Sequence, residues 1–364
     1  MRTLISISCY FVLGIYAYVN SFQGPAAGFA SPAVVVLKET VTTTRRDSTF
    51  QPMPDSSSSA AAASAAALLP STNQTWVHAV DSRADLRHAM APGSKITAIE
   101  TDVIMGHTTA SFTRTASGTK RIPIMAHPPI TISDLSMTDF LDNIVENEET
   151  KTVNKVIKLD FKELEPVEAT LQAIVNKQLQ TSSEGAFVLN ADILPGPGHD
   201  EKSVSIPAEL FLETCLRYIR QSQDQHHQQT NNGRNQAPRF AFSLGFRAHC
   251  SDPHGYTASH VQSMSDLITR YQLQSTKDDP ASDNNNHNNG NIGVILALNA
   301  RQLAKSLDQF DGIMDLFPDL QILAWVGKGE PGIQRESIQS IETHFRKLGM
   351  SNRIGFDCRV SIML

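Results

Sequence analysis

Eight short apolar runs alternate with amphipathic stretches along residues 73–364, and this alternation constrains the fold most strongly. The strand-like runs are Trp76–Val80, Ile96–Met105, Val156–Phe161, Ala186–Leu194, Arg239–Phe246, Ile292–Leu298, Leu320–Val326 and Arg353–Arg359. The stretches between them with helical spacing are Arg83–Met90, Met137–Asn147, Pro166–Leu179, Pro207–Arg220, Ala258–Tyr271, Ala300–Leu316 and Ile333–Leu348. Such alternation with short connections is typical of βα units that build a parallel sheet.

The number of units favours an α/β fold of the (β/α)8 TIM-like barrel type, whose usual size is close to that of residues 73–364. An open doubly wound sheet is the alternative. No Gly-rich dinucleotide fingerprint follows the first strand-like run, which counts against that alternative.

Three polar insertions depart from an ideal barrel. Gly106–Lys120 is rich in Thr, Ser and Gly and leads to an extra short strand at Ile122–Ala126, so it predicts a hairpin after the second strand, over the barrel mouth. Gln221–Pro238 and Ser275–Asn291 are low-complexity segments rich in Gln, Asn and His. We expect both of these to be disordered surface loops.

The first 72 residues differ in composition from the predicted barrel domain. Residues 1–30 contain the apolar run Leu4–Val19 and predict a signal peptide or, alternatively, an N-terminal anchor. The run is shorter than the roughly 20 apolar residues that span a bilayer. Residues 31–72 are rich in Ala, Ser, Thr and Pro and predict a disordered linker. A secreted protein or one of the endomembrane lumen is expected, and an organellar bipartite signal is the alternative.

Charge and cysteine content exclude some classes of function. The formal net charge is −6 and the basic residues form no stripe, so nucleic acid is not an expected partner. Membrane contact is expected only through an uncleaved N-terminus. Beyond Cys9 in the presumed signal, Cys215, Cys250 and Cys358 lack metal-site spacing, although one pair could form a disulfide. Asn73 begins an Asn-Gln-Thr sequon and is a candidate glycosylation site.

Polar side chains gather at the ends of the first strands. Glu100 and Asp102 lie two residues apart in an apolar run, so on a strand they share one face. The runs Lys158-Leu159-Asp160-Phe161-Lys162 and Asn190-Ala191-Asp192 repeat this pattern. In barrels and open α/β sheets the carboxyl ends of the strands carry the site, so we expect these side chains to converge.

The converging groups predict a metal site for phosphodiester chemistry. Glu100, Asp102 and Asp160 would be an all-oxygen ligand set, which suits Mg²⁺ or Ca²⁺ better than zinc. The imidazoles of His78 and His127 could then act as general acid and base.

Other interpretations of these residues stay open. Lys158 and Lys162 could neutralise the acids in a structural salt-bridge network without any metal. The two histidines could be hydrogen-bonded core residues, and Asn190 and Asp192 could cap the following loop. Trp325 could be a ligand platform or a core aromatic residue. A Schiff-base lyase that uses Lys158 or Lys162 is a distant alternative.

Four sequence blocks carry a family resemblance. They are His78-Ala79-Val80-Asp81-Ser82-Arg83, Pro123-Ile124-Met125-Ala126-His127-Pro128-Pro129, Ile157-Lys158-Leu159-Asp160-Phe161-Lys162 and Leu189-Asn190-Ala191-Asp192-Ile193-Leu194-Pro195-Gly196-Pro197. In this order the blocks resemble the menorin family, and more distantly the glycerophosphodiester phosphodiesterase group of phospholipase-C-like barrels.

The resemblance implies a secreted or membrane-associated protein with a phosphodiesterase-like barrel. It implies metal ligation by Glu100, Asp102 and Asp160, an acid/base pair of His78 and His127, and a position near the phosphate for Lys162. Lys158, Asn190, Asp192 and Trp325 are candidate substrate-binding residues.

The chain also departs from the pattern of the phosphodiesterase group. That group has His-Arg-Gly where this chain has His78-Ala79-Val80, and His-Asp where it has His127-Pro128. Loss of the Arg removes a bidentate phosphate contact that a Lys cannot replace. Two hypotheses follow: a phosphodiesterase acting on a phosphodiester-type small molecule or lipid head group, and a non-catalytic extracellular adaptor that binds a protein partner.

Overall fold

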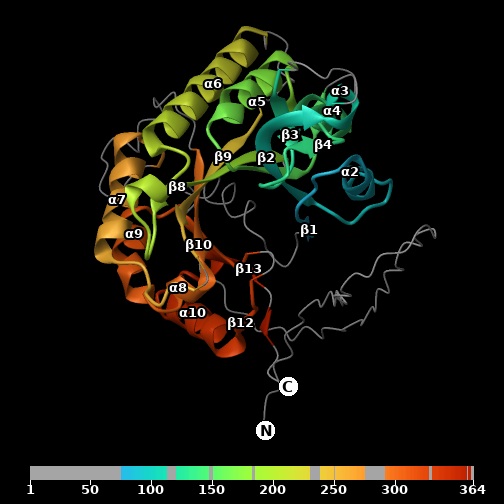
Figure 1. Cartoon of the computed structure of the whole chain (residues 1–364). Helices are drawn as coiled ribbons and strands as arrows, with labels where there is room; N and C mark the ends of the chain where they lie inside the picture. Colours follow the sequence, from blue (N-terminus) through green and yellow to red (C-terminus); the bar gives the residue numbers. More distant parts are fainter. Residues whose placement is uncertain are drawn as a thin grey trace, which may run out of the picture. The chain divides into compact units, whose positions relative to one another are not determined.

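Eight parallel strands hydrogen-bond side by side in chain order and form the central sheet (Figure 1). They are β1 (Trp76–Val77), β2 (Ala98–Thr108), β6 (Val156–Phe161), β8 (Ala186–Pro195), β9 (Phe240–Arg247), β10 (Gly293–Asn299), β11 (Gln321–Trp325) and β13 (Ile354–Asp357). Each strand lies in one of the eight predicted runs or overlaps most of it. The prediction of eight parallel strands in sequential order is therefore confirmed.

This computed structural model describes residues 75–112, 120–146, 151–182, 185–229, 238–249, 251–274, 292–327, 330–358 and 360–361. All of them belong to the compact unit that spans Ser57–Leu364, and the other unit, Met1–Ser56, lies outside the described residues. The predicted signal peptide, the predicted linker, the Asn73 sequon and the predicted loop Ser275–Asn291 also lie outside them.

The helices lie along the outer side of the curved sheet (Figure 1). They are α2 (Arg83–Ala89), α3 (Thr109–Phe112), α4 (Met137–Asn143), α5 (Glu165–Asn176), α6 (Ala208–Gln229), α7 (Ala258–Arg270), α8 (Ala300–Leu303), α9 (Asp311–Leu316) and α10 (Arg335–Lys347). Short 3-10 turns are η1 (Glu201–Ser203), η3 (Leu307–Phe310) and η4 (Ser351–Arg353). Within the ranges given above, no helix is both long enough and apolar enough to cross a bilayer.

The predicted helix Ala300–Leu316 is broken in the middle. Ser306 has a non-helical backbone, with φ −147°. Its hydroxyl donates to the carbonyl of Gln302 at 2.8 Å and accepts from the backbone N–H of Tyr256 at 3.0 Å. A serine that bonds backbone groups in this way competes with helix formation, so α8 ends and α9 starts separately.

Two apolar layers hold the sheet. The larger lies between sheet and helices and contains the fully buried phenylalanines Phe140, Phe161, Phe187, Phe211, Phe242, Phe246, Phe310, Phe317 and Phe345. The smaller lies on the opposite, concave face and contains Ala98, Val156, Ala186, Val188, Ala241, Ile295 and Leu323, with Trp76 packed against it. Because one cluster joins residues of β1 and β11, the sheet must curl strongly.

The curl brings the two edge strands near each other. His78, just after β1, has its Nε2 at 3.3 Å from Oδ1 of Asp357 at the end of β13. Among the described residues no backbone pairing joins β1 to β13. The structure therefore contains a curled parallel sheet with outer helices, and a closed eight-unit barrel is not confirmed.

The predicted hairpin after the second strand is present. β2 continues to Thr108 and pairs antiparallel with β3 (Ile122–Met125) and parallel with β4 (Ile132–Ser133). Gly106 is required there, because a Cβ would lie 2.4 Å from Cδ1 of Ile124 and 2.5 Å from the carbonyl of Thr131. Two small sheets, β5 (Thr152–Val153) with β7 (Gln180–Thr181) and β12 (Ile333–Gln334) with β14 (Val360–Ser361), complete the strands described.

The prediction of a disordered loop over Gln221–Pro238 is wrong for its first half. α6 continues without a break to Gln229, whereas residues 230–237 lie outside the described residues. Gln, Ser, Asp and His are tolerated in a helix, and the first Gly or Pro after Gln221 is Gly233. Low complexity therefore indicated polarity here, but not the absence of structure.

Arg353 provides a test of how the last strand is anchored. Its guanidinium donates to three backbone carbonyls around the end of α9, at Leu320 (2.8 Å), Met314 (2.8 Å) and Phe317 (2.6 Å). Arg353→Leu should lower the free energy of unfolding by about 2 to 4 kcal/mol, because these carbonyls lose their donor. Denaturant unfolding followed by circular dichroism measures this change in the free energy of unfolding.

The matched control is Arg335→Leu. Arg335 is exposed on α10, and its replacement should change the free energy of unfolding by less than about 0.5 kcal/mol. Equal effects of the two substitutions would contradict the anchoring role of Arg353.

Candidate functional site

Three carboxylates converge near the point where the parallel pairing of β2 with β6 ends. The parallel register sets Asp102 directly opposite Asp160 and Glu100 opposite Lys158. Glu100 and Asp102 are 8% and 4% exposed. Oxygens of Glu100, Asp102 and Asp160 all lie within 4.8 Å of one another, which makes these residues a group that could hold a metal ion. The three predicted metal ligands are thus brought together.

Lys162 forms ion pairs with two members of this cluster. Its Nζ lies 2.8 Å from Oδ1 of Asp102 and 2.6 Å from Oδ2 of Asp160. Lys158 is buried on β6, and its charge acts on Glu100. Part of the predicted salt-bridge network is therefore present in the same place as the candidate metal ligands.

Burial and the neighbouring charges shift the pKa values within the cluster. Burial, and then the charges of Asp160 and Glu100, raise the pKa of Asp102 to about 7, although Lys162 acts in the opposite direction. Burial alone would lower the pKa of Lys162, but Asp160 and Asp102 outweigh it and raise that pKa. Lys162 therefore keeps its charge between Asp102 and Asp160.

His78 bridges the cluster and the last strand. Its Nδ1 lies 3.5 Å from Oε2 of Glu100, and its Nε2 faces Asp357. Burial would lower the pKa of His78, but the hydrogen bond with Glu100 and the charge of Asp357 outweigh it, so its pKa is raised. Burial would raise the pKa of Glu100, yet His78, Lys158 and the backbone N–H of Ala79 hold it well below its usual range.

Asp357 and Asp81 support the site and are absent from the sequence-based set. Asp81 accepts from the backbone N–H of Asp102 at 3.1 Å and so holds the β2 backbone beside the cluster. Asp357 is the last residue of β13 and pairs in register with Trp325, the last residue of β11. That position is the signal that could have identified Asp357.

Asn190 and Ser243 extend the site across the sheet. Asn190 is the register partner of both Asp160 and Ser243, and its Nδ2 donates to Oδ1 of Asp160 at 2.7 Å. Asn190 is 6% exposed and Ser243 is 1% exposed. The side-chain oxygens of both have no hydrogen-bond partner. Two buried acceptors beside the carboxylates therefore remain unsatisfied, which is costly without a ligand or ordered water.

Asp192 lies one step nearer the mouth than Asn190. It pairs in register with Gly245, and a Cβ on Gly245 would come within 2.2 Å of Oδ1 of Asp192. Burial, then the charge of Asp160, raises the pKa of Asp192 to about 6. The absence of a side chain at Gly245 therefore allows the Asp192 carboxyl to approach β9 closely.

Two predicted site residues, His127 and Trp325, do not contact the carboxylate cluster in any interaction among the described residues. His127 is exposed, and its Nδ1 lies 2.6 Å from the carbonyl of Pro128. Within the part of the chain that the structure describes, His127 makes no hydrogen bond with the three carboxylates. Trp325 ends β11 in register with Asn299 and Asp357, so it is at the mouth but beside the last strands.

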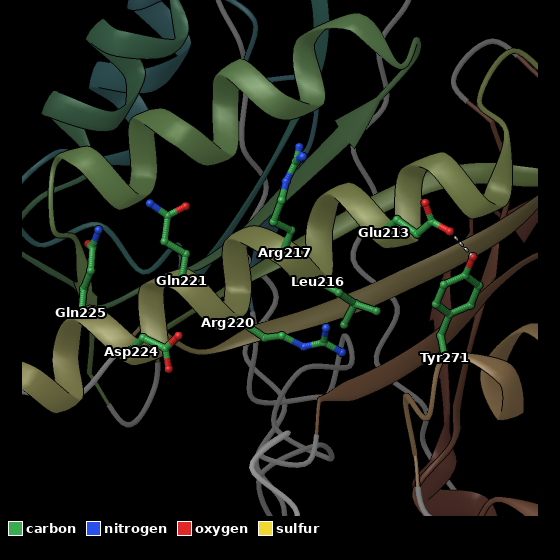
Figure 2. Close-up of a pocket in the computed structure, with 8 residues that line it drawn as sticks. All are labelled: Glu213, Leu216, Arg217, Arg220, Gln221, Asp224, Gln225 and Tyr271. Carbon is green, nitrogen blue, oxygen red and sulfur yellow. Dashed lines mark hydrogen bonds between the residues drawn. The ribbon is translucent and has the colours of Figure 1, made fainter.

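A separate surface groove of about 540 Å³ lies between α6 and α7, on the outer helices (Figure 2). Most of the residues that line it are of polar type, and Figure 2 shows Tyr271 directed at Glu213, to which its hydroxyl donates at 3.1 Å. The lining residues are Glu213, Leu216, Arg217, Arg220, Gln221, Asp224, Gln225 and Tyr271. None of them belongs to the carboxylate site.

Comparisons with known proteins agree with the four sequence blocks. Residues 71–223 match the family model described as the Menorin N-terminal domain. Protein FAM151B of Homo sapiens is 33% identical over 145 residues, which are 40% of this chain and 45% of that protein. The matched part thus spans less than half the length of this relative. No solved structure matches. Over residues 71–223, the chain is thus similar to the menorin family.

Proposed function

We propose that this chain binds a divalent cation at Glu100, Asp102 and Asp160 and hydrolyses phosphodiesters there. The observation that carries the proposal is the approach of three carboxylates to within 4.8 Å of one another in a mostly buried setting. Burying several like charges together is unfavourable unless a cation compensates them. A small organic phosphodiester or a lipid head group is the proposed substrate class.

The residues present fit such a cation. The donor set is made of oxygens alone, as Mg²⁺ and Ca²⁺ prefer. Burial first, and then the charges of Asp160 and Glu100, raise the pKa of Asp102 to about 7, so the neighbouring acids act on this carboxyl. The unsatisfied oxygen of Asn190 adds a further neutral acceptor beside Asp160.

The surrounding side chains have distinct roles in this proposal. When bound, the cation supplies positive charge for the phosphate oxygens. Lys162, held between Asp102 and Asp160, is placed to contact the phosphate as well. His78 accepts a proton from the attacking water, since Glu100 and Asp357 increase the proton affinity of its ring.

We further propose that the curled sheet closes as a (β/α)8 barrel. Support comes from the sequential order of eight parallel strands, the packing of Trp76 against the concave cluster, and the contact between His78 and Asp357. In a closed barrel, backbone amides of β1 that do not bond to β2 are protected from hydrogen exchange. Fast exchange of those amides, in a protein whose β2 and β6 amides are protected, would contradict closure.

Metal binding is the first test of the function. Glu100→Gln with Asp102→Asn should abolish calorimetric binding of Mg²⁺ and Ca²⁺ and reduce turnover of bis(p-nitrophenyl) phosphate at least about hundredfold, because both ligand charge and ligand geometry are lost. Asp266→Asn, at an exposed position on α7, is the control and should retain both. Unchanged cation binding in the double variant would refute the assignment.

A non-catalytic binding protein is the second candidate function. It is favoured by the position of Lys162, which already neutralises two of the three carboxylates, and by the exposed groove between α6 and α7. In this case Lys162 completes a structural network and no cation enters.

Lys162→Met separates the two candidates. If a cation competes with the lysine for the same oxygens, the variant should bind Mg²⁺ or Ca²⁺ about tenfold more tightly, while turnover falls because the phosphate contact is lost. If the lysine serves only the network, the variant gains no cation affinity and is less stable. Calorimetry and denaturant unfolding on the same samples distinguish these outcomes.

A further inference from the structure

The proton donor for the leaving group needs a new assignment. The family resemblance implies His127 as one member of the acid/base pair, but His127 is exposed and its ring bonds to the carbonyl of Pro128. Of the two histidines, only His78 contacts the carboxylate cluster. A phosphodiesterase that expels a basic alkoxide needs a second proton-transfer group close to the reacting phosphate.

Asp192 meets this requirement by position. It lies on the same strand face as Asn190, two residues farther toward the carboxyl end of β8. Asn190 in turn bonds Asp160. The carboxyl of Asp192 is therefore one step above the proposed ligands, on the side from which a substrate enters.

The carboxyl of Asp192 is also not held by a structural contact within the described ranges. Among the described residues it has no hydrogen-bond or ion-pair partner, although Lys162, Arg247 and Lys158 are close enough to act on it electrostatically. Carboxylates that serve structure are usually paired, as Asp139 is with Arg83. A carboxyl without a partner at the mouth of a site is free to exchange a proton with a ligand.

Gly245 leaves the space that the carboxyl of Asp192 occupies. Any other residue at that position would put a Cβ within 2.2 Å of Oδ1 of Asp192 and displace it. Two buried acceptors next to it, the side-chain oxygens of Asn190 and Ser243, have no partner and point independently to a ligand at this level of the sheet.

We propose that Asp192 is the general acid that protonates the leaving oxygen, in place of His127. This inference rests on the proposed phosphodiester function. Water attacks phosphorus and gives a proton to His78. The bond between phosphorus and the leaving oxygen breaks with its electron pair on that oxygen, which takes the carboxyl proton of Asp192. One phosphodiester and one water give a phosphomonoester and an alcohol.

The charge environment agrees with this role. The pKa of Asp192 is raised to about 6, whereas that of Glu100, two strands away in the cluster, is lowered. Carboxyls whose pKa values are pushed apart in one site commonly divide the acid role and the ionised role between them.

The test compares two methyl phosphate esters, with p-nitrophenol and with phenol as leaving group, using the full chain with Mg²⁺. p-Nitrophenolate leaves without help, whereas phenolate is more basic and needs a proton. Asp192→Asn should reduce turnover of the phenyl ester about hundredfold or more and that of the p-nitrophenyl ester less than about tenfold. Retained turnover of the p-nitrophenyl ester also shows that the variant is folded.

Gly245→Ala is the second variant, because it leaves the Asp192 carboxyl present but displaces it. It should produce the same selective loss on the phenyl ester. Asp266→Asn, an exposed carboxylate on α7 that accepts from Gln262, is the matched control and should match wild type on both esters.

Three results would overturn the assignment. Equal losses on the two esters in Asp192→Asn, or no loss, exclude Asp192 as the acid. A selective loss in His127→Gln but not in Asp192→Asn returns the role to His127. No wild-type turnover of either ester overturns the proposed hydrolysis together with this inference, and calorimetry then tells whether the cation site survives.

Discussion

The pairing of Asp102 with Asp160 across two parallel strands is the constraint on which the rest of the site depends. Parallel register brings two carboxylates face to face in a mostly buried setting, and Glu100 adds a third. Each neighbouring feature compensates for this charge. Lys162 bridges two of the acids, the backbone of Ala79 and the ring of His78 bind the third, and Asn190 donates to Asp160. Burying three carboxylates together is costly, and these partners offset part of that cost.

The sheet positions these groups because its two faces differ. The face toward the helices is filled by large aromatic side chains, which bury most of the apolar area and leave little room for polar groups. The concave face is lined lower down by small and branched residues such as Ala98, Ala186 and Ala241. Side chains alternate between the two faces along each strand, so the polar residues on the concave face all come from positions two apart. The aromatic layer fixes the strands, and the strands in turn align the carboxylates.

Much of this arrangement can be predicted from the sequence. All eight strands, their order and the convergence of Glu100, Asp102 and Asp160 follow from period-two patterns and from the rule that strand ends share one edge. The failures occurred where tertiary contacts decide. The exposed position of His127 cannot be read from residue spacing, and spacing could not decide between a metal site and the lysine network that Lys162 forms with Asp102 and Asp160.

At the polar end of α6, the prediction of disorder failed for a different reason. Its residues Gln221–Gln229 have the composition of disordered segments, yet they continue a helix that is already formed and packed. Gly245 illustrates the converse. A glycine inside a strand is expected to weaken it, and only the neighbouring Asp192 explains why one is needed there.

The contact between His78 and Asp357 joins the first strand of the domain to the last. The family match ends at residue 223, so it includes every carboxylate of the cluster but not Asp357. The contact therefore joins residues that lie far apart in the chain, at the two edges of the central sheet. Loop closure over such a distance is entropically costly and slow, so we expect the surroundings of His78 to be completed after the carboxylate cluster has formed.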